Sequence, residues 1–406
     1  MLFNKEDVVI EKEDVFMRKT MPIISLFVLL ILLGDAGLAF GQAAGGLVST
    51  IAGTGGHGHR DGSAAQFNMP RAAFKGEDGI YIADTYNNLI RNLGTGSVTT
   101  EAGNIAEGSF GLDAFGLPRG LFKDGAHAYF NRPQSGITLP DGRVLVADSA
   151  NHALRIIERG TTTTLSGGFL SVAPRAGHVD GRLEDALFNY PSALAIDAQG
   201  YVYIADALNH VIRRIDLEAG LVSTIAGAAG LPGYTNGTAA AAQFNSPMGI
   251  AVSSSGLVYV ADTGNHLIRV IEGGYVRTLA GSFILADELE WEDAEGEWDN
   301  ALIGGFADGS AQEAMFNLPV GLSMAHHSDD VLIVADSANH AIRMVTSQGQ
   351  TTTIAGTGLP GHEDGPAQQA GFHLPAGVLA LKNGDILIVD TGNNLIRRLE
   401  SIEFPD

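Results

Sequence analysis

The chain has 406 residues, of which 46 are Asp or Glu and 24 are Lys or Arg, so its formal net charge is −22. This excess of acidic residues disfavours binding to nucleic acids and to anionic membranes, because both require clustered basic side chains. The chain has no cysteine, which excludes disulfides, zinc–thiolate sites and catalysis by a thiol.

The first segments in chain order are typical of an exported protein. We interpret residues 1–16, rich in acids, as a non-native or misassigned leader. Residues 17–43 have the order of a secretory signal peptide, with a basic start at Met17-Arg18-Lys19, an apolar run over 23–33 and small residues after it. The apolar run is too short for a comfortable membrane span. We therefore expect a secreted or cell-surface protein without a stable span after cleavage; an uncleaved anchor is the alternative.

From about residue 47 to residue 400, the phrase Asp-x-x-Asn-His/Asn-x-Ile/Leu-Arg occurs in six copies. A fixed phrase that returns at intervals of about 54 to 74 residues indicates a repeat architecture. The Asp, Asn and Arg positions of the copies are Asp84, Asn87 and Arg91; Asp148, Asn151 and Arg155; Asp206, Asn209 and Arg213; Asp262, Asn265 and Arg269; Asp336, Asn339 and Arg343; and Asp390, Asn393 and Arg397.

Each repeat unit is predicted to form four short antiparallel strands. In the third unit these cover residues 193–197, 201–205, 211–215 and 221–226, which are rich in β-branched and aromatic residues and are bounded by turn residues. Such four-stranded units, repeated radially, make a β-propeller. The last unit stops after its third strand, so residues 47–53 are expected to complete it and close the ring. The predicted fold is all-β, with six blades over residues 47–400 and a short tail at 401–406.

A second phrase, Asp/Asn-Gly followed by Phe-Asn-x-Pro, precedes the first strand of every unit, with His373 in place of Asn in the last copy. Together the two phrases resemble the NHL repeat family, which takes its name from the Asn-His-Leu seen here at Asn265-His266-Leu267. The resemblance covers nearly all of residues 47–400. It implies a six-bladed propeller that serves as a binding platform or, in some members, as an enzyme scaffold. We expect an exported, monomeric protein of bacterial type.

The repeated Asp is interpreted as a turn residue whose carboxylate accepts hydrogen bonds from amides two or three positions on. The Asn of the turn is expected to tolerate left-handed backbone geometry, and the Arg is expected to pair with a carboxylate. The next position is His in four copies and Asn in two, at Asn88 and Asn394. Asn replaces His as a hydrogen-bonding group far better than as a metal ligand, so a structural role is predicted here.

Function is expected where the connections between blades differ. The longest connection, 281–316, contains an acidic segment with both tryptophans of the chain. Its candidate partner-binding residues are Asp287, Glu288, Glu290, Trp291, Glu292, Asp293, Trp298 and Asp299. A solvated loop, an interface with a basic partner and a calcium site are the three interpretations of this segment, although its spacing does not match an EF-hand.

The leading hypothesis is a non-catalytic scaffold that binds an extracellular protein, peptide or glycan on its loop-rich face. No catalytic residue and no cofactor are predicted, and calcium is kept as the alternative ligand of the acidic segment. The alternative is a metal-dependent lyase, lactonase or hydrolase with its site at the central channel. That alternative needs ligands that break the symmetry of the ring, and the aligned repeats show no such set.

Overall fold

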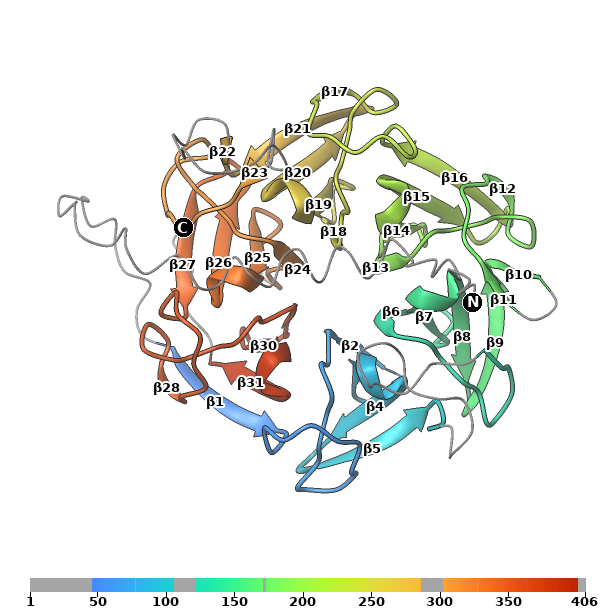
Figure 1. Cartoon of the computed structure of the whole chain (residues 1–406), viewed down its shortest axis with the longest axis horizontal. Helices are drawn as coiled ribbons and strands as arrows, with labels where there is room; N and C mark the ends of the chain where they lie inside the picture. The colour runs from blue at the N-terminus through green and yellow to red at the C-terminus, as the bar shows by residue number, and fades with distance from the viewer. Residues whose placement is uncertain are drawn as a thin grey trace, which may run out of the picture. The chain divides into compact units, whose positions relative to one another are not determined.

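The computed structural model describes residues 46–76, 78–105, 122–170, 173–285, 302–326 and 328–400. In this part of the chain, six antiparallel sheets surround a central channel (Figure 1). Each sheet is one blade, with its first strand at the channel and its fourth at the rim. The predicted all-β, six-bladed propeller is confirmed.

The strands follow the repeat boundaries predicted from the sequence. In order from the channel outward, the six blades are β2 (Ala72–Lys75), β3 (Ile80–Asp84), β4 (Leu89–Gly94) and β5 (Ser97–Ala102); β6 (Pro133–Thr138), β7 (Val144–Asp148), β8 (Ala153–Glu158) and β9 (Thr161–Ser166); β13 (Pro191–Ile196), β14 (Val202–Asp206), β15 (Val211–Asp216) and β16 (Leu221–Ala226); β18 (Gly249–Val252), β19 (Val258–Asp262), β20 (Leu267–Glu272) and β21 (Tyr275–Ala280); β24 (Pro319–Met324), β25 (Val331–Asp336), β26 (Ala341–Thr346) and β27 (Thr351–Ala355); and β29 (Gly377–Ala380), β30 (Ile386–Asp390), β31 (Leu395–Leu399) and β1 (Leu47–Ala52).

The connections between blades add short strands that the sequence analysis did not predict. β12 (Gly181–Arg182), β17 (Gly237–Thr238) and β28 (Gly365–Pro366) each pair with the outer strand of a blade. Single bridges from Gly62, Gly125 and Gly309 do the same in the other three blades. These pairings cover part of the outer edges that would otherwise expose unpaired backbone groups. The connections also contain two small antiparallel pairs, β10 (Gly168–Leu170) with β11 (Ala173–Arg175) and β22 (Ile284–Leu285) with β23 (Leu302–Ile303).

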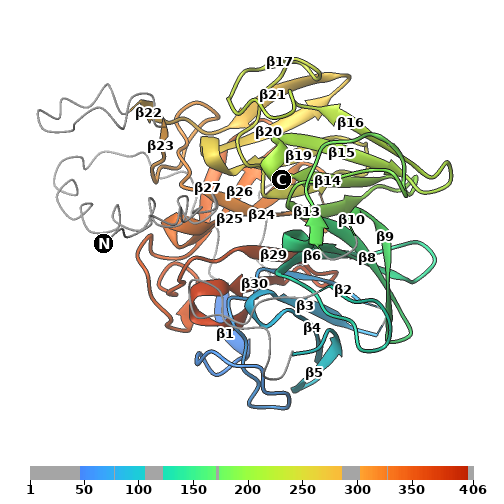
Figure 2. The same ribbon diagram turned by 45° about the vertical axis from the view of Figure 1, so that its right-hand side comes forward.

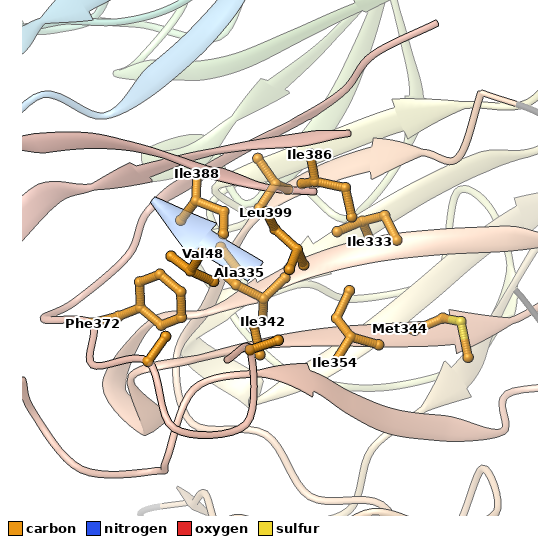
Figure 3. Close-up of a cluster of buried hydrophobic side chains, with 14 of the residues drawn as sticks. Val48, Ile333, Ala335, Ile342, Met344, Ile354, Phe372, Ile386, Ile388 and Leu399 are labelled. Carbon is orange, nitrogen blue, oxygen red and sulfur yellow. The ribbon is translucent and has the colours of Figure 1, made fainter. Parts of the chain in front are cut away.

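The ring closes through β1, as predicted. Val48 pairs with Leu399 of β31, and the amide of Glu400 donates to the carbonyl of Leu47 at 3.0 Å. Val48 is 1% exposed. Figure 3 shows it among side chains of the fifth and sixth blades, close to Ile388 and Leu399. The start of the propeller thus supplies the outer strand of its last blade.

The core consists of apolar side chains packed between neighbouring blades. Figure 2 shows the blades from a second direction. The middle strands are buried on both sides, as the run of five buried residues in β14 shows. The outer strand β16 is less buried, with only Val222 and Ala226 fully buried among its six residues. The Phe of each Phe-Asn/His-x-Pro phrase is completely buried.

Candidate functional site

The repeated Asp and Arg form a buried ion pair in every blade. In the third blade, Asp206 Oδ2 accepts from Arg213 Nη1 at 2.8 Å and from Asn209 Nδ2 at 2.8 Å. Arg213 is 0% exposed, and its Nη2 also binds Asp180 of the preceding connection at 2.6 Å. Its guanidinium lies 5.0 Å from the centre of the Phe188 ring. The expected pairing of Arg with a carboxylate is confirmed.

The same arrangement repeats around the ring. The distance from the Arg Nη1 to the inner carboxylate is 2.5 to 2.8 Å in all six blades. The outer partner is Asp in five blades and Asn236 in the fourth, where its Oδ1 accepts from Arg269 at 2.8 Å. Burial raises the pKa of the inner Asp residues, against the lowering effect of the arginine and the amide donors, and brings the pKa to about 6 for Asp84, Asp148, Asp206 and Asp262.

Two details of the predicted turn were wrong. The Asp carboxylate does not accept from the backbone amides two or three positions on. Its Oδ1 accepts instead from a backbone amide far upstream, such as that of Asn189 for Asp206 at 2.7 Å. The turn itself is a short 3-10 helix, η5 (Ala207–Asn209) in this blade. The left-handed residue is the one after the Asn, here His210 with φ 58°. This contact uses the backbone amide of the Asn position and not its side chain, which explains why His373 can stand there.

The His or Asn that follows the turn links each blade to the next. His152 Nδ1 accepts from the amide of Tyr190 at 3.0 Å, and Asn88 Oδ1 accepts from the amide of Arg132 at 2.7 Å. His210, His266, His340 and Asn394 make the same contact. The imidazole must therefore be neutral with its proton on Nε2. This explains the exchange of His and Asn and gives both a structural role.

Burial lowers the pKa of His152, His266 and His340 to about 4, and lowers that of His210 as well. Because the pKa of these histidines is lower in the folded state, their neutral form stabilises the fold fully above about pH 6.5. This stabilisation is lost as the pH falls, because the unfolded chain takes up the proton first.

We expect His152→Asn to make the protein more tolerant of acid. The variant keeps the acceptor, as Asn88 does naturally, and removes the titration. Between about pH 7 and pH 5 its free energy of unfolding should fall by about 1–2 kcal/mol less than that of the wild type. Urea denaturation at both pH values measures this, with His362→Asn, an exposed position, as the control. Identical pH dependence in wild type and His152→Asn would contradict the assignment.

These contacts fix one face of the propeller, which we call the link face: it carries the Asp turns and the connections between blades. The turn Asn binds the connection directly, as Asn209 Nδ2 does at the carbonyl of Gly177 at 2.8 Å. The central channel opens on this face. It holds a cavity of about 470 Å³ lined by the inner strands β2, β6, β13, β18, β24 and β29.

The described lining of the channel contains few side chains that bind divalent metals. None of the described lining residues is Asp or Glu, and the one lining histidine, His326, follows the end of β24 away from the link face. Among the residues that the structure describes, no group of three or more His, Asp or Glu side chains could hold a metal ion.

The six-fold symmetry breaks at the mouth of the channel on the link face. The residue after the proline lines the channel and differs in every blade: Arg71, Gln134, Ser192, Met248, Val320 and Ala376. The left-handed residue before the proline also varies and is the same only in the last two blades: Met69, Arg132, Tyr190, Ser246, Leu318 and Leu374. Blades one to three thus carry most of the polar side chains, and blades four to six are mainly apolar.

Four of these side chains, Arg71, Arg132, Gln134 and Tyr190, form what we call the mouth cluster together with Tyr86, the middle residue of the first Asp turn. Gln134 is 6% exposed, and its Nε2 donates to the Tyr190 hydroxyl at 2.7 Å. The Arg132 guanidinium lies 5.5 Å from the centre of the Tyr86 ring. Burial raises the pKa of Tyr190, while Arg71 and Arg132 lower it. The sequence analysis missed this set, although the variable x of Phe-Asn-x-Pro was its signal.

The acidic segment 287–299, with Trp291 and Trp298, lies outside the described residues. The repeated Asp, Asn and Arg residues of the turns come together within each blade, as shown above, and not across the channel. No helix in the described part of the chain has the length and hydrophobicity that a membrane crossing would need.

Comparison with known proteins agrees with this fold. The NHL repeat family model matches residues 244–271, in the fourth blade. The chain is 30% identical to Protein SUPPRESSOR OF QUENCHING 1, chloroplastic, of Arabidopsis thaliana, over 71% of this chain and 32% of that protein. It is 28% identical to NHL repeat-containing protein 2 of Bos taurus, over 64% of this chain and 45% of the relative. The chain therefore spans half or less of the length of these relatives.

Solved structures show the same architecture at low sequence identity. An auxiliary nutrient binding protein from Bacteroides ovatus has a TM-score of 0.60 and 16% identity, covering 91% of this chain and 79% of the other. The gluconolactonase XC5397 from Xanthomonas campestris has a TM-score of 0.51 and 13% identity, covering 89% and 91%. At this identity the likeness shows the fold alone. The chain is thus a six-bladed β-propeller that carries an NHL repeat and is similar to NHL repeat-containing proteins.

Proposed function

We propose that the protein is an exported, non-catalytic scaffold that binds a protein, peptide or glycan through its link face, over the channel mouth. The observation that carries this proposal is the loss of symmetry at the mouth. The Asp–Arg pairs and the blade-to-blade contacts are the same all around the ring, whereas the residues before and after each proline differ. Varied side chains on a rigid frame are typical of a binding site.

The acidic segment 287–299 remains the proposed outer contact of this site. In the sequence it lies between the fourth and fifth blades, and it combines carboxylates with two tryptophans. Aromatic anchors within a charged rim are common in interfaces. A basic partner is the proposed match for its charge, and calcium is the proposed alternative ligand.

A metal-dependent lactonase or lyase is the competing function, and the fold similarity to a gluconolactonase raises it. The channel lining described above offers no carboxylate to hold the metal, which favours the binding scaffold. Elemental analysis of protein purified without chelators distinguishes the two. A stoichiometric divalent ion that is lost when channel residues are substituted would favour the enzyme.

We expect the link face to account for ligand binding. Peptide and glycan arrays would identify a ligand, and calorimetry would compare wild type with a variant whose residues 287–299 are replaced by a Gly/Ser segment. Loss of a charged and aromatic contact should weaken binding by about tenfold or more. Substitution of Asp141 and Arg143, an exposed pair in the β6–β7 turn on the opposite face, is the control. Equal effects of the two changes would refute the proposed face.

A further inference from the structure

The fourth blade lacks one of the charges that bind the arginine in the other five blades. In those five blades the guanidinium pairs with an inner and an outer Asp, and the outer Asp stands directly before a glycine. In the fourth blade the outer residue is Asn236, and Gly237 follows it. Arg269 therefore has one carboxylate partner among the residues that the structure describes, Asp262 at 2.6 Å.

The side chain of Asn236 also offers one acceptor fewer than an Asp does. In the third blade, Asp180 uses one oxygen for its arginine and the other for the amide of Thr224 at 2.9 Å. Asn236 has a single oxygen, which accepts from Arg269 Nη2 at 2.8 Å. Its NH₂ group cannot accept from the amide of Thr278, which stands where Thr224 stands in the third blade. An Asp at position 236 would supply both acceptors.

Asn followed by Gly is a pair that loses its side-chain amide readily, because glycine has no side chain to shield its backbone nitrogen. The nitrogen of Gly237 attacks Cγ of Asn236, the bond from Cγ to the side-chain nitrogen breaks, and ammonia leaves with the proton of the Gly237 amide. The two residues are then joined in a cyclic imide. Water opens the imide at Cγ to give Asp, or at the backbone carbonyl to give isoaspartate. The net reaction consumes one water and releases one ammonia.

The surroundings of Asn236 favour this attack. The attack places negative charge on Oδ1, the atom to which Arg269 Nη2 donates, and a guanidinium held there stabilises that charge. Asn236 is exposed, so water reaches the imide. Gly237 belongs to β17, which lies beside β21 in Figure 1 and pairs with it through two residues. Only this short pair has to separate before the nitrogen can attack.

The chain contains a second Asn-Gly pair with the opposite surroundings, Asn383-Gly384. Asn383 is also exposed, in the β29–β30 turn, but its Nδ2 donates to Asp385 Oδ2 at 2.8 Å. A carboxylate beside the amide disfavours negative charge on it. We propose that Asn236 deamidates spontaneously in the folded protein, and that the resulting Asp gives Arg269 its second carboxylate. This modification site does not depend on the proposed binding function.

Mass spectrometry measures the conversion at both sites in the full chain, kept at mildly alkaline pH and digested at intervals. In the folded protein Asn236 should react at least about tenfold faster than Asn383. In concentrated urea, which removes the contacts with Arg269 and Asp385, the two rates should be similar. Asn236→Gln should stop the reaction at its own position, and Asn383→Gln should leave the rate at Asn236 unchanged.

The variant Asn236→Asp represents the product. In urea denaturation its folding equilibrium constant should be about fivefold higher than that of freshly purified wild type, because it gains a carboxylate for Arg269 and an acceptor for the Thr278 amide. Asn383→Asp is the matched control, and it should change the folding equilibrium constant by no more than about twofold.

Two results would overturn the proposed site: a rate at Asn236 no higher than that at Asn383 in the folded protein, or the same ratio of the two rates in folded and unfolded protein. The product tests the second part of the proposal. Mainly aspartate supports the new ion pair, whereas isoaspartate lengthens the backbone and cannot keep Gly237 paired with Val276. Mainly isoaspartate, or an Asn236→Asp variant no more stable than the wild type, would overturn the ion pair.

Discussion

Replacing Asp206 with Asn should lower the free energy of unfolding by about 3–5 kcal/mol, because it leaves Arg213 buried without its inner counter-ion. The carboxylate accepts from three donors: the amide of Asn189, the side chain of Asn209 and Arg213. An Asn side chain has one acceptor oxygen and one NH₂ group. In either orientation the NH₂ group would face a donor, so at least one buried hydrogen bond is lost as well.

The matched control is Asp180→Asn in the same blade. Asp180 is the outer partner of Arg213, and its side chain is 43% exposed. The fourth blade already has Asn236 at the equivalent position, where it binds Arg269 at 2.8 Å. This change should therefore cost only about 1 kcal/mol.

Urea denaturation at about pH 8 compares the two variants, because Asp206, with a pKa raised to about 6, is ionised there. Both variants should show the same slope as the wild type if the unfolded surface is unchanged. Equal losses for Asp206→Asn and Asp180→Asn would contradict the inner and outer roles assigned to the two carboxylates.

The sequence alone predicts most of this fold because each blade repeats the same two phrases and the same pattern of strands. The strand ranges of the third unit, the blade number and the closure by residues 47–53 all follow from aligning six copies. The alignment of the repeats does not show which backbone groups from distant parts of the sequence contact each Asp. The amide that binds Asp206 Oδ1 belongs to Asn189, and an expectation based on local turns places the donor after the Asp instead.

The channel mouth was missed for a related reason. Alignment of repeats draws attention to positions that stay constant, and those are structural here. Tyr190 and Gln134 are 56 residues apart and meet only because neighbouring blades bring their inner strands together. The variable x of Phe-Asn-x-Pro marks a position beside the channel. Its backbone has the same left-handed conformation in every blade, while its side chain varies.

Replacing Val48 with Asp should open the ring. Val48 is 1% exposed and packs with Ile388 and Leu399 in the core of the last blade. A carboxylate there is buried without a partner, so we expect a loss of stability of at least about 3 kcal/mol. In the described structure, β1 pairs with the outer side of β31. Release of β1 therefore leaves the outer edge of β31 unpaired.

Leu47→Asp is the control for this prediction. Leu47 is the next residue of the same strand, but its side chain points outward and is 45% exposed. Its substitution should change stability by no more than about 0.5 kcal/mol. Hydrogen exchange distinguishes opening of the ring from general destabilisation: in Val48→Asp the amides of β1 and β31 should exchange faster than those of β15 and β16 in the third blade. Equally faster exchange of the amides in all blades would show that the six sheets unfold as one unit. Closure by β1 would then be no weaker than the contacts between the other blades. Selective exchange at β1 and β31 would instead identify the joined ends as the place where the propeller opens first.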